Sequence, residues 1–369
     1  MDIDKAKAAL KTAAEITEKN RHAFEGGFPA PASEKGVYPK IENDDWTAGF
    51  YTGLMWMFYE HTGRDLFRET AEGHLISFRD RLDRRVAVDH HDMGFIYGLS
   101  CEAAYKLTGN HLAKETALLA ADNLKGRFQE KGNFFQAWGQ IGDRSEYRLI
   151  IDCLLNLPLL YWAAEVTGDP SYRELAEKHF STTRGTVIRE NFSTCHTYYF
   201  DPQTGAPLRG ATKQGYSDTS TWSRGQAWAV YGLMLNYIYL KDLSVIPQWK
   251  GVTDYFIAHL PGDFAAYWDF HFHDGPEPRD SSASAIAVCG ILEAYRQGVC
   301  GKEYLEKAYA ILESLIDNYA AKAEEGGILK HSTYGRLLGE GIDEFTLWGD
   351  YFYTEALMRI VYPEWKTYW

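Results

Sequence analysis

The stretch WTAGFYTGLMWMFYEH, residues 46–61, is apolar on almost every side of a helix and is followed directly by Thr62 and Gly63. A glycine one step beyond an apolar helical run is a helix stop signal. Residues 92–107 and 151–166 repeat the pattern, and each is also followed by a Thr-Gly pair. Helices that are apolar on nearly all sides are buried, so these segments predict inner helices.

Each of these apolar segments is followed by a charged, amphipathic one, which is the pattern of a solvent-facing helix. The later apolar segments are residues 221–240, 280–297 and 345–362. The amphipathic segments are residues 3–20, 66–84, 111–128, 172–181, 249–260 and 302–319. Six apolar and six amphipathic helices, spaced by roughly 40–60 residues, indicate a repeated two-helix unit.

Six helix pairs can close into a ring, with the apolar helices inside and the amphipathic helices outside. We therefore predict an all-α fold, the (α/α)6 barrel, formed by a single domain over residues 1–369. An open solenoid is the structural alternative. It is disfavoured because the terminal units do not show the polar outer faces that cap open arrays.

The composition excludes several functions. A net charge of −13 argues against nucleic acid as a partner, because phosphate contacts need clustered Lys and Arg. No apolar run reaches the length of a membrane span, and the charged start (MDIDKAK, residues 1–7) has no signal-peptide core. The five cysteines are scattered without C-x-x-C spacing, which predicts reduced thiols and a cytoplasmic protein. The sequence predicts no oligomeric state.

The aromatic content is unusual, with 11 Trp, 25 Tyr and 19 Phe. Helical cores use aromatic residues, but a surplus of Trp and Tyr also suits sugar binding, since pyranose faces stack on aromatic rings. Residues 193–225 fit no helix, and we expect a short strand at 197–200 followed by a turn. Long ordered loops in compact domains are usually functional, so this one is expected to cover one mouth of the barrel.

Asp152 is the best candidate for chemistry because it interrupts the apolar run LIIDCLLNLPLL at residues 149–160. Burial disfavours the charged form of a carboxyl group and raises its pKa, as a general acid requires. A buried aspartate satisfied by the backbone or by Asn156 is the alternative. Asp92 closes the cluster Asp89-His90-His91-Asp92 and is the second candidate, although a helix cap would also explain it.

A metal site is considered at the same cluster and is not predicted. His90 and His91 are adjacent and would point in different directions on a helix, and no H-x-x-x-H or H-E-x-x-H spacing is present. The chain also lacks a G-x-S-x-G elbow, a P-loop and a dinucleotide G-x-G-x-x-G motif. No cofactor is therefore expected.

Four tryptophans lie near the starts of inner helices or in linking loops, which favours a shared aromatic pocket: Trp46, Trp138, Trp222 and Trp228. Arg224 lies between two of them, and its planar guanidinium suits a carboxylate clamp, although a salt bridge at the surface is the alternative. His196 and Gln214 in the long loop could hydrogen-bond sugar hydroxyls or position water. We also expect His91 to contact substrate.

The ordered motifs of the chain resemble those of the unsaturated glucuronyl hydrolases, glycoside hydrolase family 88. They are Asp45-Trp46-Thr47, Asp89-His90-His91-Asp92, Gln136-Ala137-Trp138-Gly139, Ile150-Ile151-Asp152-Cys153, His196-Thr197, Ser220-Thr221-Trp222, Arg224-Gly225-Gln226-Ala227-Trp228, Tyr267-Trp268-Asp269-Phe270, Arg279-Asp280-Ser281-Ser282 and Trp348-Gly349-Asp350-Tyr351. The resemblance covers nearly the whole length of the chain.

The resemblance implies an (α/α)6 barrel and a small oligosaccharide substrate with a 4,5-unsaturated uronic acid at its non-reducing end, as polysaccharide lyases produce from glycosaminoglycans. It implies that Asp152 is the general acid/base and that Asp92 assists it. Residues matching Trp46, His196, Gln214, Arg224 and Trp228 are expected to line the sugar site. The implied reaction is protonation of a vinyl ether at C4 and addition of water at C5.

Several alternatives stay open. They are an unsaturated rhamnogalacturonyl hydrolase, a sugar epimerase on a helical toroid, an inverting glycosidase with two flanking carboxylates, and a carbohydrate-binding scaffold without turnover. The Ser-x-x-Ser-x-Lys pattern of family members that prefer sulfated substrates is absent, because the matching region reads STYGRL at residues 332–337. The resemblance therefore does not extend to a preference for sulfated disaccharides.

Overall fold

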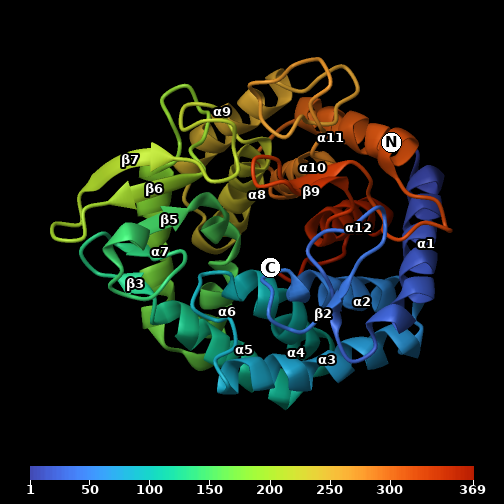
Figure 1. Ribbon diagram of the computed structural model, residues 1–369, viewed down its shortest axis with the longest axis horizontal. Helices are drawn as coiled ribbons and strands as arrows, with labels where there is room; N and C mark the ends of the chain where they lie inside the picture. Colours follow the sequence, from blue (N-terminus) through green and yellow to red (C-terminus); the bar gives the residue numbers. More distant parts are fainter.

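The computed structural model describes residues 1–369 and shows two concentric rings of helices around one axis (Figure 1). The inner helices are α2 (Ala48–Thr62), α4 (Ala103–Thr108), α6 (Pro158–Thr167), α8 (Ser223–Leu240), α10 (Ser281–Arg296) and α12 (Leu347–Val361). The outer helices are α1 (Ile3–Asn20), α3 (Asp65–Asp83), α5 (His111–Lys125), α7 (Pro170–Thr186), α9 (Val245–Ala258) and α11 (Lys302–Ser314).

The inner ring is closed rather than open. A π-helical segment, Gly94–Glu102, continues into α4 and packs against both α2 and α6, while α8 packs against α10 and α10 against α12. Contacts between α12 and α2 complete the ring. The predicted all-α toroid is thereby confirmed, and the open solenoid is wrong. No helix is both long and apolar enough to cross a membrane.

The predicted stop signals act as expected. Gly63, Gly109 and Gly168 follow α2, α4 and α6 with φ of +67°, +72° and +75°. Glycine adopts this left-handed conformation at little steric cost. Its backbone N–H then donates a hydrogen bond to a carbonyl in the last turn of the helix. The apolar faces then meet in one continuous cluster of 100 buried hydrophobic residues.

Two inner segments differ from the predicted regular helices. The segment predicted at 151–166 begins as a 3-10 turn, Ile151–Leu155, and becomes α-helical only at Pro158. Proline has no N–H to donate and its fixed φ suits the first helical position, so the helix starts there. The segment at 92–107 is π-helical from Gly94 to Glu102, which an apolar pattern does not reveal.

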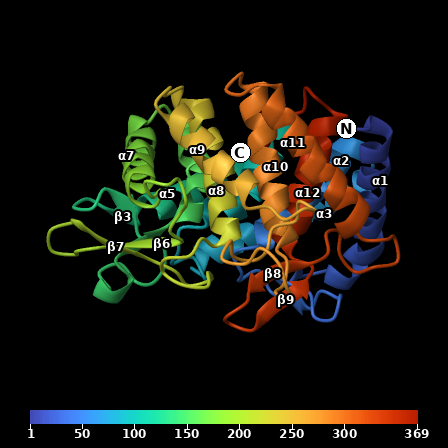
Figure 2. The ribbon, with the colours of Figure 1, turned by 90° about the horizontal axis from the view of Figure 1, so that it is seen from above.

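Short strands gather at one end of the barrel (Figure 2). The strands are β1 (Phe28–Pro29), β2 (Lys40–Ile41), β3 (Phe128–Gln129), β4 (Phe134–Phe135), β5 (Arg148–Ile150), β6 (Thr197–Phe200), β7 (Pro207–Ala211), β8 (Ser332–Gly335) and β9 (Glu340–Glu344). The strand expected at 197–200 is β6, and it pairs with β5 and β7 in an antiparallel sheet. The long loop thus lies at one mouth of the barrel, as predicted.

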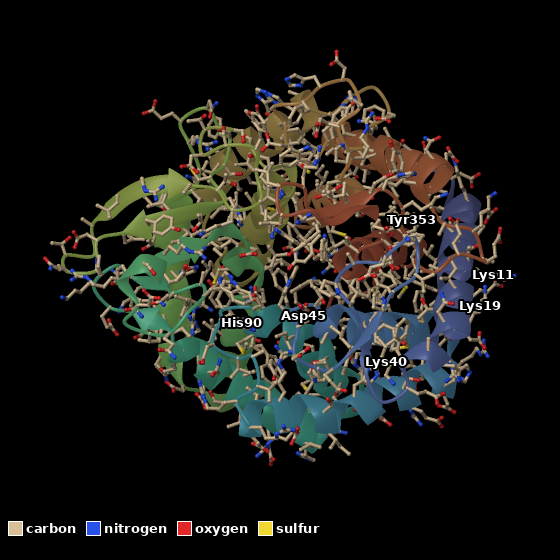
Figure 3. The ribbon with its side chains drawn as sticks, viewed as in Figure 1. Lys11, Lys19, Lys40, Asp45, His90 and Tyr353 are labelled. Carbon is tan, nitrogen blue, oxygen red and sulfur yellow. The ribbon has the colours of Figure 1, made fainter.

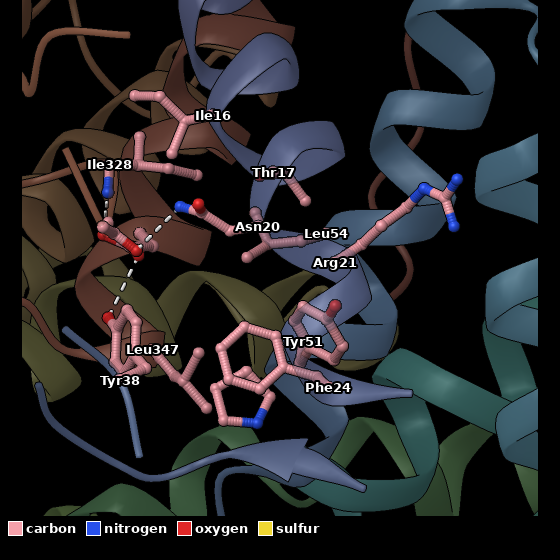
Figure 4. A pocket seen from close by; sticks show the side chains of 14 residues that line it. Ile16, Thr17, Asn20, Arg21, Phe24, Tyr38, Tyr51, Leu54, Ile328 and Leu347 are labelled. Carbon is pink, nitrogen blue, oxygen red and sulfur yellow. Dashed lines mark hydrogen bonds between the residues drawn. The ribbon is translucent and has the colours of Figure 1, made fainter. Parts of the chain in front are cut away.

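A small cavity lies among α1, α2 and the start of α12, and it is lined in part by Tyr38, Tyr51 and Ile328 (Figure 4). The buried carboxyl of Asp350 reaches it, accepting hydrogen bonds from the backbone N–H groups of Ile328 and Leu329 and lying 3.0 Å from the Tyr38 hydroxyl. Burial raises the pKa of Asp350 to about 7, against the lowering effect of those hydrogen bonds.

We expect Asp350→Asn to stabilise the protein increasingly as pH rises. An unfolded aspartate loses its proton near pH 3.9, so between that value and about 7 the folded state binds one more proton and its stability falls with pH. Asparagine does not titrate. The gain in free energy of unfolding of the variant over the native protein, relative to its value at low pH, therefore reaches about 4 kcal/mol at most, at roughly 1.4 kcal/mol per pKa unit. Thermal melts of both proteins at pH 4 and pH 8 measure this. A difference in Tm that is the same at both pH values would contradict it.

Candidate active site

The N-terminal ends of the inner helices converge on the mouth that carries the strands. Trp46 precedes α2, Asp92 precedes the π-helical segment, Asp152 lies in the turn before α6, and Arg224 lies in the first turn of α8. In Figure 3, Asp45 and His90, which lie one residue before Trp46 and two before Asp92, are labelled near the middle of the ring, whereas Lys11 and Lys19 lie at its outer edge on α1. Helix N-termini carry partial positive charge, so this mouth favours anions despite the net charge of the chain.

A close backbone approach brings Asp92 and Asp152 together. A Cβ on Gly94 would lie only 2.5 Å from the Cα of Asn156, so a larger residue there would push the two segments apart. The Asn156 side chain joins the segments by accepting the N–H of Phe95 at 2.8 Å, and its amide nitrogen lies 3.5 Å from Asp92 Oδ1. Asn156 therefore holds Asp92 and the backbone of Asp152, not the Asp152 carboxyl.

His91 lies between the two carboxyl groups. Its Nε2 is 3.3 Å from Asp92 Oδ1 and 3.2 Å from Asp152 Oδ1. Both contacts are too bent to count as hydrogen bonds, and neither ring nitrogen has another partner. The side chain of Asp152 is 18% exposed, and since Oδ1 is buried against His91, the exposed atom is Oδ2. Asp152 thus presents one oxygen to solvent, while Asp92 and His91 lie beneath it.

The three groups shift one another's pKa values in a consistent pattern. Burial raises the pKa of Asp152 above its ordinary value, and the nearby His91 offsets only part of that rise. Burial also acts to raise the pKa of Asp92, but His91 outweighs it and leaves that pKa below the usual range. Burial acts to lower the pKa of His91, yet the two carboxyl groups raise it well above its usual value. Relative to isolated groups, this pattern favours the neutral form of Asp152 and the charged forms of Asp92 and His91.

One cavity of about 180 Å³ opens above Asp152. Nine of the ten residues predicted from the sequence line it: Trp46, Asp92, Trp138, Asp152, His196, Gln214, Trp222, Arg224 and Trp228. Four further residues line the cavity that were not predicted as site residues: Arg148, Ile150, Lys213 and Tyr334. Lys213 adjoins Gln214 and Ile150 lies two residues before Asp152, so adjacency was a usable signal for these two. Arg148 lies further from any predicted residue, and Tyr334 comes from β8, so neither carried a local signal.

His91 is the predicted residue that does not line the cavity. Its side chain is 0% exposed, so the expectation that it contacts substrate is wrong. The backbone explains why, because the His91 N–H donates to the carbonyl of Ala137 and its own carbonyl accepts from Met93. These bonds turn the ring inward, behind Asp92 and Asp152.

Arg224 lines the cavity but is not free to act as a carboxylate clamp. Its Nη1 donates to the Asp280 carboxylate and to the carbonyl of Thr333, and its Nη2 donates to the Tyr334 carbonyl and to Gln214 Oε1. The guanidinium is buried and neutralised by Asp280. Arg224 is therefore neither part of a surface salt bridge nor a carboxylate clamp. Its hydrogen bonds join α8, the start of α10 and β8.

Aromatic rings form the walls of the cavity, as the tryptophan pattern predicted. The Trp46 ring stacks on Trp348, and its Nε1 donates to the Tyr334 hydroxyl at 3.0 Å. Trp138 stacks on His90 and is 39% exposed, which makes it the most accessible of the four predicted tryptophans. Trp228 is 1% exposed and serves mainly as packing beneath the cavity.

His196 is placed beside Asp152 by strand pairing. Ile150 in β5 pairs with Thr197 in β6, and the Ile151 N–H donates to the His196 carbonyl. The ring Nδ1 accepts backbone N–H groups of Lys213 and Gln214, so the proton lies on Nε2. Burial lowers the pKa of His196 to about 3, helped by the positive charges of Arg148 and Arg224. The ring is a neutral N–H donor facing the cavity.

One group of side chains has the compactness of a cation site. His91, Asp92 and Asp152 each offer a ligand atom, and these atoms lie within 4.8 Å of one another. We assign no metal ligands here, and the absence of a metal stays a prediction from the sequence.

Comparison with known proteins places this geometry in a family. Residues 20–361 match the model of Glycosyl Hydrolase Family 88. The chain is 48% identical over 359 residues to an unsaturated chondroitin disaccharide hydrolase of Streptococcus pneumoniae, covering 95% of this chain and 90% of that protein.

Solved structures agree. The crystal structure of unsaturated glucuronyl hydrolase from Streptococcus agalactiae superposes with a TM-score of 0.97 at 42% identity, covering 100% of this chain and 94% of that one. A variant of the same enzyme complexed with dGlcA-GalNAc6S gives a TM-score of 0.89 at 39% identity, with the same coverage. These neighbours have the (α/α)6 toroid. The chain is therefore a glycoside hydrolase and belongs to glycosyl hydrolase family 88.

Proposed function

We propose that this protein hydrolyses small unsaturated oligosaccharides derived from glycosaminoglycans, and unsaturated chondroitin disaccharides in particular. The observation that carries the proposal is the carboxyl group of Asp152, whose pKa is raised by burial and which presents one accessible oxygen at the floor of a cavity walled by tryptophans. The relative from Streptococcus pneumoniae and the disaccharide complex of the Streptococcus agalactiae enzyme support the substrate class.

The reaction proposed for this site is hydration of the vinyl ether of the unsaturated uronic acid. Asp152 Oδ2 donates its proton to C4, and positive charge develops at C5 and the ring oxygen. Water then adds to C5 and returns a proton to Asp152. The resulting hemiketal opens to a ketone, and loss of the C1 substituent releases the neighbouring sugar. The negative charge of Asp92, fixed beneath the site, stabilises the cationic intermediate.

The placement of the two carboxyl groups does not suit a conventional glycosidase. In such enzymes two carboxyl groups flank the scissile bond, about 5–5.5 Å apart in retaining and about 6.5–9.5 Å apart in inverting enzymes. Here Asp92 lies under Asp152 with only 3% of its side chain exposed, and one oxygen of each lies within 4.8 Å. No sugar fits between them. One accessible acid supported from below is what vinyl ether hydration requires.

The uronate carboxylate is bound by donors other than the Nη groups of Arg224, and the cations Arg148 and Lys213 also line the cavity. The converging helix N-termini, the His196 Nε2–H and the Gln214 amide supply donors at the cavity wall. The Gln214 Oε1 is held by Arg224, which leaves its NH₂ group as the donor. We also infer that residues 1–369 act as one catalytic domain, since the ring closes through α12 and α2 over one core.

A panel of unsaturated disaccharides tests the proposal. With chondroitin disaccharides we expect the ultraviolet absorbance of the substrate double bond to be lost, with a kcat of roughly 1–10³ per second, which is the ordinary range of enzymes. Rhamnogalacturonan-derived disaccharides should be turned over with lower kcat/KM. Faster turnover of the pectic substrate would assign the sister activity, and an epimerised product that keeps its absorbance would assign an isomerase.

A further inference from the structure

His91 is a buried histidine that does not line the cavity, although its ring contacts both catalytic candidates. Neither ring nitrogen makes a hydrogen bond. Its Nε2 lies 3.3 Å from Asp92 Oδ1 and 3.2 Å from Asp152 Oδ1, and its side chain is fully buried. A buried histidine whose two ring nitrogens lack hydrogen bonds is unfavourable unless the ring has another role.

We propose that His91 is a positioning residue that supplies the fixed positive charge under the site, so that Asp92 stays ionised beside the Asp152 carboxyl that donates its proton to C4. This inference rests on the proposed function of the cavity. His91 touches no substrate and acts only through the two aspartates.

The need for such a charge follows from the burial of Asp92. A carboxylate with 3% of its side chain exposed is too costly to hold in charged form without a compensating cation. Its other polar contacts are the amide of Asn156 and the Nδ1 of His90, which accepts the Asp92 backbone N–H. His90 Nδ1 also lies 3.1 Å from Asp92 Oδ2, while its Nε2 contacts the Ala87 carbonyl. His91 differs from His90 because it contacts both carboxyl groups, and its charge is the largest single effect that lowers the pKa of Asp92.

Two other titratable groups packed against His91, His179 and Cys153, are neutral. Burial lowers the pKa of His179 to about 3, and its Nδ1 accepts the N–H of Phe135. Burial raises the pKa of the Cys153 thiol, which stays protonated. Arg127 acts on Asp92 only at longer range and directs its guanidinium to the carbonyls of Gln136 and Gly139. None of these three groups provides a positive charge between the two carboxyl groups, as His91 does.

Without that charge the two carboxyl groups would hold protons more tightly. His91 lowers the pKa of both Asp92 and Asp152, so removing it raises both. The kcat profile of the native enzyme should fall at low pH as Asp92 gains a proton and at high pH as Asp152 loses one. In a variant without the cation, both limbs move to higher pH. Asp92 would then be protonated in the pH range where the native enzyme is fully active.

The test compares His91→Gln with His91→Lys on an unsaturated chondroitin disaccharide. We expect His91→Gln to move both limbs of the kcat profile upward by at least about one pH unit and to lower kcat at pH 6 about 10²-fold. KM should change less than about threefold, because the ring does not line the cavity. His91→Lys restores a charge without the ring, so its limbs should stay within about half a unit of the native positions even if kcat falls.

His179→Gln is the matched control, since it removes an equally buried but neutral histidine. Its limbs should not move. Limbs that stay in place in His91→Gln, or that shift equally in the Lys and Gln variants, would overturn the inference and leave His91 as packing. If His91→Gln does not fold, His91→Lys alone tests the inference. A shift of about one pH unit in the limbs of its kcat profile would contradict the proposed role of the His91 charge. Failure of the native protein on every unsaturated disaccharide would instead defeat the proposed function.

Discussion

Asp152→Asn is expected to lower kcat by a factor of about 10³ to 10⁴ while leaving the fold and substrate binding intact. The carboxyl donates one proton and accepts another in the proposed reaction, and an amide can do neither. General acid–base groups typically contribute about 10² to 10⁴ in rate. The asparagine is nearly the same size, and the native side chain has no hydrogen bond from Oδ1 to lose. Absorbance assays for kcat and calorimetric titration for binding separate the two properties.

A neighbouring aspartate serves as the control for that variant. Asp89 lies in the same segment as Asp92, but it is exposed and pairs with Arg85 at the surface. Asp89→Asn should keep kcat and KM within about twofold, because exposed ion pairs contribute little. Near-normal turnover by Asp152→Asn would remove the basis of the proposed function.

Arg224→Met should destabilise the folded protein by about 3–5 kcal/mol, the usual range when one partner of a buried ion pair is removed. The loss arises because Asp280 remains as an unpaired buried charge and the carbonyls of Thr333 and Tyr334 lose their donor. KM should rise too, since Gln214 would no longer be held at the cavity wall. Urea unfolding monitored by circular dichroism measures the change in stability.

A double substitution tests the cause. Asp280→Asn in the Arg224→Met background should recover part of the lost stability, because it removes the uncompensated charge. Arg64→Ala, which breaks an exposed pair with Glu18, should cost less than about 1 kcal/mol and serves as the reference. A loss below about 1 kcal/mol for Arg224→Met would show that Arg224 is not the link between α8, α10 and β8 described above.

The sequence predicted the barrel well because the signals that define it are local. The inner helices are apolar on nearly all sides, and a glycine directly follows three of them, so both features are visible in one short window of sequence. The rise in the pKa of Asp152 followed from the same reasoning, since a carboxyl group in the middle of the apolar segment LIIDCLLNLPLL is expected to be buried with that segment.

The parts that could not be predicted depend on partners far apart in the chain. Arg224 meets Asp280 and the backbone of β8, which lie 56 and more than 100 residues away, so no local pattern shows that its donors are already used. The inward turn of His91 depends on a bond to Ala137 in another segment. Tyr334 reaches the cavity from β8 for the same reason.

The central claim is that Asp152 protonates C4 and that cleavage follows hydration of the double bond. It is tested most directly by running the native enzyme in D₂O and recording double-bond absorbance and free hexosamine in the same sample. We expect absorbance to disappear no later than hexosamine is released, with a single deuterium on one face of C4. Free hexosamine appearing while the absorbance persists would show direct cleavage of the glycosidic bond and contradict the account.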